Sequence, residues 1–455
     1  MTRPRAFLAD RRARELGLGL LAVLVATGGY VLLALSEAPT VPPGLWAFLG
    51  VVVGLFGVAH LAVRRLAPLA DATLLPIVAL LAGLGFVTIA RLDLAVPPAR
   101  RLALTQAVWV GVGILAFVAT LTAVRRVRTL ERYRYTILCA GVAALLLPLV
   151  PGLGYEANGA RLWIRIGTLN FQPGEAAKVL LVVFFAAYLV DNREVLAAGA
   201  RRLGPVSVPN VRHVGPVVVP WMLSILIMVS QKDLGSSLLF FAVFLAMLYM
   251  ATGRVAYLVV GFVLFGAAAL FAYRTFGHVT DRVQIWLDPW ADPQGKGYQL
   301  IQSLFALGEG GLTGTGLGLG RPDLIPNAAT DFVLPALGEE LGFAGTLAVL
   351  CGYLLLVARG FRVAVETPRP FSQLFAAGLA TILGIQTFVI VGGVTRVIPL
   401  TGVTLPFVSY GGSSLVANFV IVALLLRISD ETARAALDDA ARRARLMPAG
   451  APVAP

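Results

Sequence analysis

The sequence predicts an all-α polytopic membrane protein, and three observations lead to this fold class. Of the 455 residues, 58% are hydrophobic and only 13% are charged, which leaves too little polar surface to cover a soluble globule. Apolar runs long enough to cross a bilayer as helices recur from Gly17 to Leu426. These runs lack the alternating pattern of a barrel strand, so helices are the spanning elements that remain.

We predict about 12 transmembrane helices from these runs. They cover residues 17–35, 44–63, 72–91, 103–123, 135–152, 176–191, 215–231, 235–252, 255–273, 333–358, 372–394 and 405–427. With the N-terminus in the cytoplasm, 25 of the 37 lysine and arginine residues fall in cytoplasmic segments. The net charge of +13 is therefore interpreted as a topology signal rather than as a nucleic-acid-binding surface, and both termini are expected in the cytoplasm.

The long external segment 274–332 far exceeds the usual connection length, which indicates a functional or disordered loop. Its tryptophans and the helical spacing of Tyr298–Leu307 argue against disorder. Asp288 and Asp292 each precede a proline, which holds both residues out of helical geometry. Two interpretations stay open: a pair of Asx turns in a surface loop, or a carboxylate that serves as a general base at the membrane boundary.

The glycine-rich stretch that follows, residues 308–320, matches neither of the common phosphate-binding patterns. We therefore expect a tightly folded, close-packed loop there. Glu339 and Glu340 come within about two turns of the start of the next span, where a carboxylate needs a partner or a polar cavity. A structural ion pair and a catalytic role are both consistent with these two residues.

Other charged pairs stand at the external ends of predicted helices. Glu175 and Lys178 are three residues apart at a helix start that Pro173 can open, so they share a face. Lys232 and Asp233 form a second pair of opposite charge in a short turn. The small residues of 406–414 would let helices approach closely. The three histidines form no visible metal site, although carboxylates and substrate phosphates could hold a divalent cation.

Taken together, these segments resemble the SEDS family (shape, elongation, division and sporulation proteins), which includes RodA and FtsW. The matching strings, in family order, are Asn158-Gly-Ala-Arg161 with Trp163, Gln172-Pro-Gly-Glu175 with Lys178, Lys232-Asp-Leu-Gly235, Asp292-Pro with Gly297-Tyr-Gln-Leu-Ile-Gln-Ser303, Thr330-Asp331-Phe332 with Gly338-Glu-Glu-Leu-Gly342, and Pro406-Phe-Val-Ser-Tyr-Gly-Gly-Ser-Ser414. The string Arg396–Gly402 is similar to an actinobacterial RodA-type branch. The family pattern has other residues at Gly174, Asn327 and Ala329, which weakens the case for those side chains.

The resemblance implies a domain organisation. The family core of ten spans is expected over residues 69–429, with the extracellular loop at 274–332. Residues 1–68 would then be a cytoplasmic N-terminus with two additional spans. Residues 430–455 are expected to form a cytoplasmic tail that begins as a charged helix and ends in a disordered Pro/Ala/Gly segment.

The resemblance also implies a function. It predicts a peptidoglycan glycosyltransferase that polymerises lipid II on the outer face of the plasma membrane, for elongation or division. Asp292 would be the catalytic base. Substrate binding would fall to Arg161, Trp163, Glu175, Lys178, Lys232, Asp233, Asp331, Glu339, Arg396 and Ser409.

Of these residues, Arg161, Lys178, Lys232 and Arg396 are the candidates for the diphosphate, with Mg²⁺ or Mn²⁺ as a further candidate. The implied partners are a class B penicillin-binding protein and other proteins of the elongation or division complex. A lipid II flippase and a non-catalytic membrane scaffold remain as alternatives on composition alone.

Overall fold

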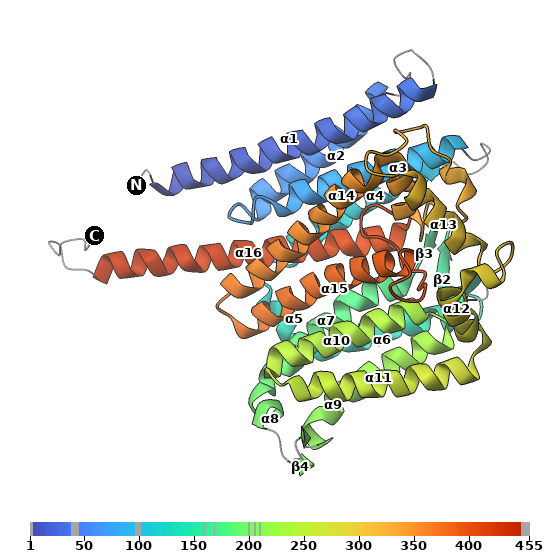
Figure 1. Ribbon diagram of the computed structural model, residues 1–455. Helices are drawn as coiled ribbons and strands as arrows, with labels where there is room; N and C mark the ends of the chain where they lie inside the picture. Colours follow the sequence, from blue (N-terminus) through green and yellow to red (C-terminus); the bar gives the residue numbers. More distant parts are fainter. Residues whose placement is uncertain are drawn as a thin grey trace.

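The computed structural model describes residues 3–37, 45–95, 102–157, 160–167, 169–198, 201–203, 206–208 and 211–446. Helices dominate these residues (Figure 1). The α-helices are α1 (Arg3–Glu37), α2 (Leu45–Leu66), α3 (Leu74–Ala95), α4 (Leu102–Ala123), α5 (Arg128–Arg132), α6 (Arg134–Leu146), α7 (Pro173–Asp191), α8 (Arg193–Ala198), α9 (Val211–Ser230), α10 (Leu234–Thr252), α11 (Val255–Thr275), α12 (Gly277–Leu287), α13 (Tyr298–Glu309), α14 (Val333–Glu366), α15 (Pro370–Val394) and α16 (Gly412–Leu446). Three single-turn 3-10 helices are η1 (Leu147–Leu149), η2 (Pro289–Ala291) and η3 (Pro322–Leu324).

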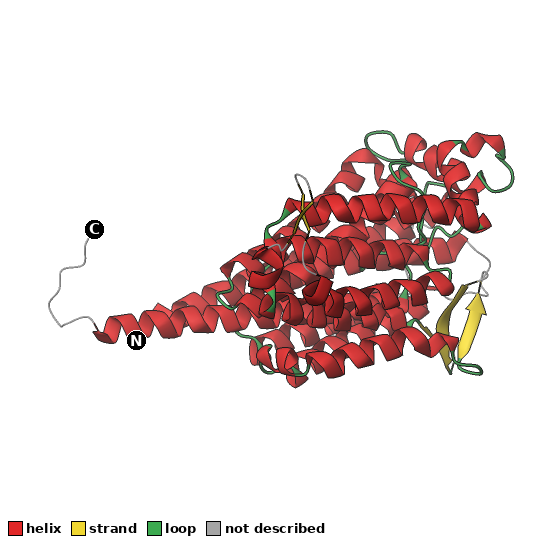
Figure 2. Cartoon of the chain, turned by 90° about the horizontal axis from the view of Figure 1, so that it is seen from below, coloured by secondary structure: helices red, strands yellow, loops and turns green. Residues whose placement is uncertain are grey.

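The long helices run side by side in one bundle with two distinct ends (Figure 1). The start of α1 and the end of α16 lie at one end, which we name the terminal end. Helices α12 and α13 and a small sheet lie at the opposite end, which we name the loop end. Figure 2 shows this sheet at the loop end, while α16 extends beyond the bundle on the other side.

Ten helices of the described chain are long and apolar enough to cross a membrane. Two shorter apolar helices, Arg134–Leu149 and Gly215–Ser230, occupy the places of the fifth and seventh predicted spans. The protein is therefore a multi-pass membrane protein, as the sequence predicts. Helices α7, α15 and α16 are largely buried within the bundle, whereas α11 presents most of its apolar surface outward.

The last span differs from its predicted bounds of 405–427. It begins only at Gly412, because Phe407 adopts a left-handed conformation with φ of 67° and the residues before Gly412 form a loop. Gly412 allows α4 to approach closely, since a Cβ there would lie 2.0 Å from the ring of Trp109. The charged start of the tail continues α16 to Leu446, as predicted, and the Pro/Ala/Gly end of the tail lies outside the described residues.

The loop end also contains an antiparallel sheet that our sequence analysis did not predict. Its strands are β1 (Gly154–Ala157), β2 (Ala160–Ile166) and β3 (Leu169–Phe171), in the order β1-β2-β3. Tyr155 pairs with Trp163, and Arg165 pairs with Asn170. A two-stranded hairpin, β4 (Arg201–Leu203) and β5 (Val206–Val208), forms elsewhere. The family-motif residue Asn158 lies outside the described residues.

The long segment 274–332, predicted to be external, contains two helices. The predicted helical stretch from Tyr298 is confirmed as α13, which buries Leu300, Ile301 and Ala306 on one face. Helix α12 precedes it and was not predicted. The segment is thus a folded layer over the loop end of the bundle.

The glycine-rich stretch packs against a break in α14, which confirms the prediction of a close-packed loop. Gly342 interrupts the helix with φ of 68°, and a Cβ on it would lie 2.2 Å from the amide nitrogen of Gly314. The loop supplies the hydrogen bonds that the broken helix lacks. Phe343 donates its amide to Gly311 O at 2.9 Å, and Thr315 donates its amide to Glu339 O at 2.9 Å.

Charged side chains fix the same loop. Arg91 on α3 pairs with Glu340 at 2.9 Å and also donates to Gly320 O at 2.9 Å. Glu339 accepts a hydrogen bond from the backbone amide of Arg321 at 2.6 Å. Both glutamates are buried, so these contacts provide the partners that carboxylates in a membrane helix require. Of the two predicted roles for this pair, the structure supports the structural one.

Candidate active site

A cavity of about 480 Å³ opens at the loop end, within the size range of pockets that bind organic ligands. Its walls come from the sheet, the starts of α4, α7, α10 and α16, helix α12, the segment before α14 and the loop between α15 and α16. Its charged lining residues are Glu175, Lys232, Asp233, Arg282 and Asp331. Charged residues from segments far apart in the sequence therefore line the same cavity.

The start of α7 carries the first of these charges. Pro173 opens the helix, and Glu175 lies in its first turn, where the helix dipole favours an anion. Lys178 pairs with Glu175 at 2.6 Å, and both side chains are buried, so the predicted ion pair is confirmed. Glu175 lines the cavity, whereas Lys178 lies beneath its wall.

The turn between α9 and α10 provides Lys232 and Asp233. Lys232 adopts a left-handed conformation with φ of 62°, which is uncommon for a residue other than glycine. Asp233 does not pair with its neighbour; its side chain caps α10 by accepting from Ser236 N at 2.9 Å. Burial raises the pKa of Asp233 despite this hydrogen bond. Lys232 is therefore free of the partner that the sequence suggested, and it lines the cavity.

Backbone strain concentrates at this end of the molecule. Among the described residues, the non-glycine residues with positive φ are Lys232, Asn327, Arg396 and Phe407. Lys232 and Asn327 line the cavity, and the other two belong to the loop from α15 to α16 that forms one of its walls. Such strain persists only where the surrounding structure enforces it, and it is common at functional sites.

Arg282 and Asp331 face each other across the cavity wall near Gly402. Arg282 comes from α12 and donates Nη1 to Leu400 O at 3.0 Å. A Cβ on Gly402 would lie 3.6 Å from Asp331 Oδ2 and 3.9 Å from Arg282 Nη2, so both charged groups lie close to this glycine. Burial raises the pKa of Asp331 to about 6, although Thr330 and Arg282 act in the opposite direction.

Arg282 was not among the site residues predicted from the sequence. It belongs to α12, a helix that was not predicted, so its position at the cavity could not be inferred. A signal was present: Arg282 and Trp286 are four residues apart, which puts them on one helical face. Trp286 anchors that face by donating its indole N–H to Arg396 O at 3.0 Å.

Several predicted substrate-binding residues lie outside the cavity. Arg396 uses its guanidinium to hold the end of α12, donating to Trp286 O at 3.0 Å and Leu287 O at 2.9 Å. Ser409 bridges two loops, donating to Thr330 O at 2.6 Å and accepting from Leu405 N at 2.9 Å. The Glu339 carboxylate accepts its hydrogen bond from the backbone amide of Arg321, at the end of the glycine-rich loop.

Arg161 also falls outside the cavity lining, although its strand contributes Ala160, Leu162 and Trp163. Its guanidinium packs beside Gly154, where a Cβ would lie 3.0 Å from Arg161 Nε. Of the four cations predicted to meet the diphosphate, only Lys232 lines the cavity. Long side chains at a helix end or on a strand can point to several places, and here the packing directs three of them elsewhere.

Asp292 is an exposed residue that is not part of the cavity lining. Its carboxylate accepts hydrogen bonds from Gly295 N at 3.0 Å and Lys296 N at 2.9 Å. Asp288 accepts from Trp290 N at 3.1 Å. The Asx-turn interpretation is confirmed for Asp288, which accepts from the amide two residues on. The Asp292 carboxylate instead accepts from the amides three and four residues on, and its catalytic interpretation stays a prediction.

No group of three or more His, Cys, Asp and Glu side chains within the described residues is arranged to hold a metal ion. The cavity carboxylates Glu175, Asp233 and Asp331 are oxygen donors of the kind that Mg²⁺ and Mn²⁺ accept. They fit a divalent cation only if phosphate oxygens of a substrate complete its coordination.

Known proteins match the chain over most of its length. A family model described as FtsW/RodA/SpoVE cell cycle protein matches residues 72–434. The peptidoglycan glycosyltransferase RodA of Mycobacterium tuberculosis is 45% identical over 431 residues, which cover 93% of this chain and 91% of that protein. A probable peptidoglycan glycosyltransferase FtsW of Geobacter sulfurreducens is 37% identical over 308 residues, which cover 66% of this chain and 79% of that protein.

Solved structures agree with these relatives. A chain of a peptidoglycan synthase complex that coordinates polymerisation and crosslinking matches with a TM-score of 0.63 and 30% identity, covering 80% of this chain and 98% of that one. The rod shape determining protein RodA of Thermus thermophilus matches with a TM-score of 0.57 and 29% identity, covering 79% of this chain and 96% of that one. The chain therefore belongs to the FtsW/RodA/SpoVE family of peptidoglycan glycosyltransferases.

Proposed function

We propose that this enzyme polymerises lipid II in the cavity at the loop end, which faces the outside of the plasma membrane, with both termini in the cytoplasm. The observation that carries the proposal is the cavity itself, because it places two cations and three carboxylates around a space of about 480 Å³. A lipid-linked diphosphate sugar needs such a mixture of groups: cations for the diphosphate and a carboxylate for the reacting hydroxyl.

The proposed reaction transfers a glycan chain from one lipid to another. The 4-hydroxyl oxygen of the acceptor sugar attacks C1 of the donor's terminal sugar and forms the new glycosidic bond. The bond from C1 to the diphosphate oxygen breaks, so undecaprenyl diphosphate leaves with the bonding electrons. The hydroxyl proton passes to a carboxylate base. Positive charge is therefore required where the diphosphate departs, and a base is required near the acceptor hydroxyl.

Lys232 and Arg282 are the proposed diphosphate-binding cations. Both line the cavity, and Arg282 keeps guanidinium N–H groups beyond the one that it donates to Leu400 O. This assignment retains Lys232 from the four cations expected from the sequence and adds Arg282. Because carboxylates outnumber cations in the lining, Mg²⁺ or Mn²⁺ held between them and the diphosphate would assist the leaving group.

Asp292 remains the proposed base on the strength of its family motif. Its carboxylate is exposed and already ordered by two backbone amides, so the segment between α12 and α13 would need to carry it toward the bound acceptor. Asp331 is a second candidate, because it lines the cavity and burial brings its pKa to about 6, close to the working pH of a general base.

One experiment tests the activity and separates the two bases. The purified protein, with a class B penicillin-binding protein as its proposed partner, would receive lipid II, and glycan chains would be resolved by gel. Asp292→Asn should abolish polymerisation, whereas Asp331→Asn should leave a measurable rate. The reverse pattern would transfer the role to Asp331, and full activity in both variants would remove the base mechanism.

The wild-type reaction also decides between classes of function. A flippase would move lipid II across a vesicle membrane without making glycan, and a scaffold would do neither. Omitting the partner tests whether polymerisation depends on it. Adding a chelator tests the divalent cation, because activity that survives metal removal would exclude that part of the proposal.

A further inference from the structure

Gln386 lies directly beneath the cavity, where both the oxygen and the nitrogen of its side-chain amide form hydrogen bonds. The residue is on α15 and is completely buried. Its Oε1 accepts a hydrogen bond from Lys178 Nζ at 3.3 Å. Its Nε2 donates to Thr404 O at 2.9 Å and to Ser414 Oγ at 3.1 Å. One carbonyl and two N–H groups are all that a glutamine side chain offers, so every polar function of this amide has a partner.

The partners of Gln386 belong to three different walls of the cavity. Thr404 and Ser414 line it directly, from the loop before α16 and from α16 itself. Lys178 does not reach the cavity, but it pairs at 2.6 Å with Glu175, which does. A single side chain therefore fixes α7, the loop and α16 relative to one another from below the site.

An amide makes contacts here that other side chains of similar size cannot make. A leucine would leave the buried Lys178 with one partner fewer and would leave Thr404 O without its donor from Gln386. A carboxylate would lose both N–H donors and add a negative charge beside the buried Glu175–Lys178 pair. The ionisable groups that face this region are Lys178, with Glu175 behind it and Asp233 near that pair.

We propose that Gln386 is a positioning residue of the active site: by holding Lys178 it sets the place of Glu175, and by holding Thr404 and Ser414 it sets the opposite wall. The proposal rests on the proposed function, because it concerns the geometry of the same cavity. An ordinary buried glutamine would contribute to stability alone, whereas a positioning residue contributes to the rate at which bound substrate reacts.

The test uses Gln386→Glu and Gln386→Leu in the full-length protein with its partner. A protonated carboxyl resembles an amide, because it has one acceptor oxygen and one O–H donor. The ratio of Gln386→Glu activity to wild-type activity should therefore rise as the pH falls and the introduced carboxyl becomes protonated. Gln386→Leu should lower kcat by about 10- to 100-fold at all pH values, with little change in the KM for lipid II.

The matched control is Thr387→Val. Thr387 is the next residue on the same helix, is also buried, and donates only to Leu383 O within its own helix at 2.8 Å. It should keep wild-type kcat. Each variant's Tm is measured in parallel at each pH. A constant activity ratio for Gln386→Glu, or a ratio that only follows Tm, would overturn the proposal. Absence of glycan from the wild-type protein would instead overturn the proposed function.

Discussion

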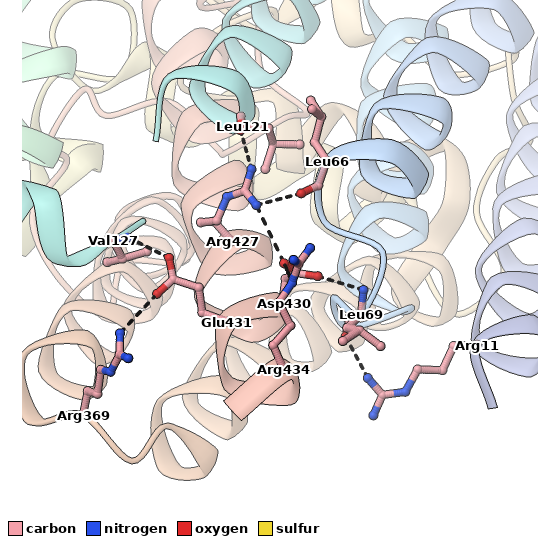
Figure 3. Close-up of polar contacts among 10 residues, drawn as sticks. All are labelled: Arg11, Leu66, Leu69, Leu121, Val127, Arg369, Arg427, Asp430, Glu431 and Arg434. Carbon is pink, nitrogen blue, oxygen red and sulfur yellow. Dashed lines mark hydrogen bonds and ion pairs between the residues drawn. The ribbon is translucent and has the colours of Figure 1, made fainter. Parts of the chain in front are cut away.

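The charged side chains of α16 at the terminal end and those around the cavity at the loop end have different surroundings. At the terminal end, α16 ties its neighbours together through fixed contacts (Figure 3). Arg427 donates to Leu66 O at 2.7 Å and also to Leu121 O, and Asp430 accepts from Leu69 N at 2.8 Å. Glu431 accepts from Val127 N at 2.7 Å. At the loop end, Lys232, Arg282 and Asp331 instead surround an open space.

This difference in surroundings separates structural charge from functional charge. Arg427 and Asp430 are both buried, and their contacts are with backbone groups of neighbouring segments and with each other. The charges around the cavity have fewer protein partners and a volume in front of them. A buried charge with its contacts completed by the protein stabilises the fold, whereas one that faces a cavity can serve a ligand.

Removing Asp430 should produce the largest loss of stability. Its side chain is 1% exposed and pairs with Arg427 at 3.7 Å and Arg434 at 2.8 Å. Asp430→Ala would leave the buried Arg427 without its carboxylate and Leu69 N without its acceptor, at a cost of about 3–5 kcal/mol. Thermal unfolding in detergent measures the loss. The activity of the protein that remains folded should stay close to wild type.

Arg434→Ala is the matched control for this variant. The Arg434 side chain is 51% exposed, so its loss should cost at most about 1 kcal/mol. Equal destabilisation by both substitutions would contradict the view that the buried contacts at the terminal end hold the helices together.

Arg282→Gln should act on activity rather than on the fold. If Arg282 stabilises the departing diphosphate, its loss should lower kcat by about 10²- to 10³-fold with little change in Tm. Arg274→Gln is the control, because Arg274 is an exposed cation in the last turn of α11, just before α12, and lies outside the cavity lining. Comparable losses in the two variants would indicate a general effect of external charge.

The pH profile should show the smallest of these effects. Burial raises the pKa of Asp331 from 3.8 to about 6, so this carboxyl is protonated in half of the molecules near pH 6. If the ionised form is needed beside Arg282, activity should fall about tenfold for each pH unit below that value. Asp331→Asn cannot ionise, so it should lack this acid limb and keep only the low, measurable rate of the protonated form at every pH. A wild-type rate that stays flat between about pH 5 and 7 would contradict the assignment.

The sign of this shift also bears on stability. A carboxyl whose pKa is higher in the folded state than in the unfolded chain favours folding in its protonated form. That contribution is complete below the unfolded pKa near 4 and disappears as the pH rises through about 6. The loss of activity on acidification should therefore be reversible, because protonation of Asp331 does not weaken the fold.

Local patterns predicted much of the fold. The apolar runs located the membrane helices, the spacing of Tyr298–Leu307 located α13, and the separation of Glu175 from Lys178 predicted their ion pair. The sheet was missed, although β2 alternates charged or aromatic with aliphatic residues from Ala160 to Arg165, which is the period of a strand. The segment is short, and its neighbours carry no comparable pattern.

The side chains that line the cavity could not be predicted in the same way. Arg396 and Arg282 both lie in segments predicted to be external, and the sequence selected Arg396, which lies outside the cavity lining. Which of them faces the cavity depends on how α12 lies against the loop after α15, and that packing joins residues more than 100 positions apart. Long-range packing of this kind leaves no periodic signal in a single sequence.

The break in α14 at Gly342 couples the glycine-rich loop to a membrane-spanning helix. Because the amides of Thr315 and Gly316 bond to the carbonyls of Glu339 and Glu340, part of a loop completes the hydrogen-bond ladder of a membrane helix. The loop and the helix are then one cooperative unit, and neither can open alone without leaving buried backbone groups unpaired. A substitution that loosens the loop should therefore also destabilise the first half of α14.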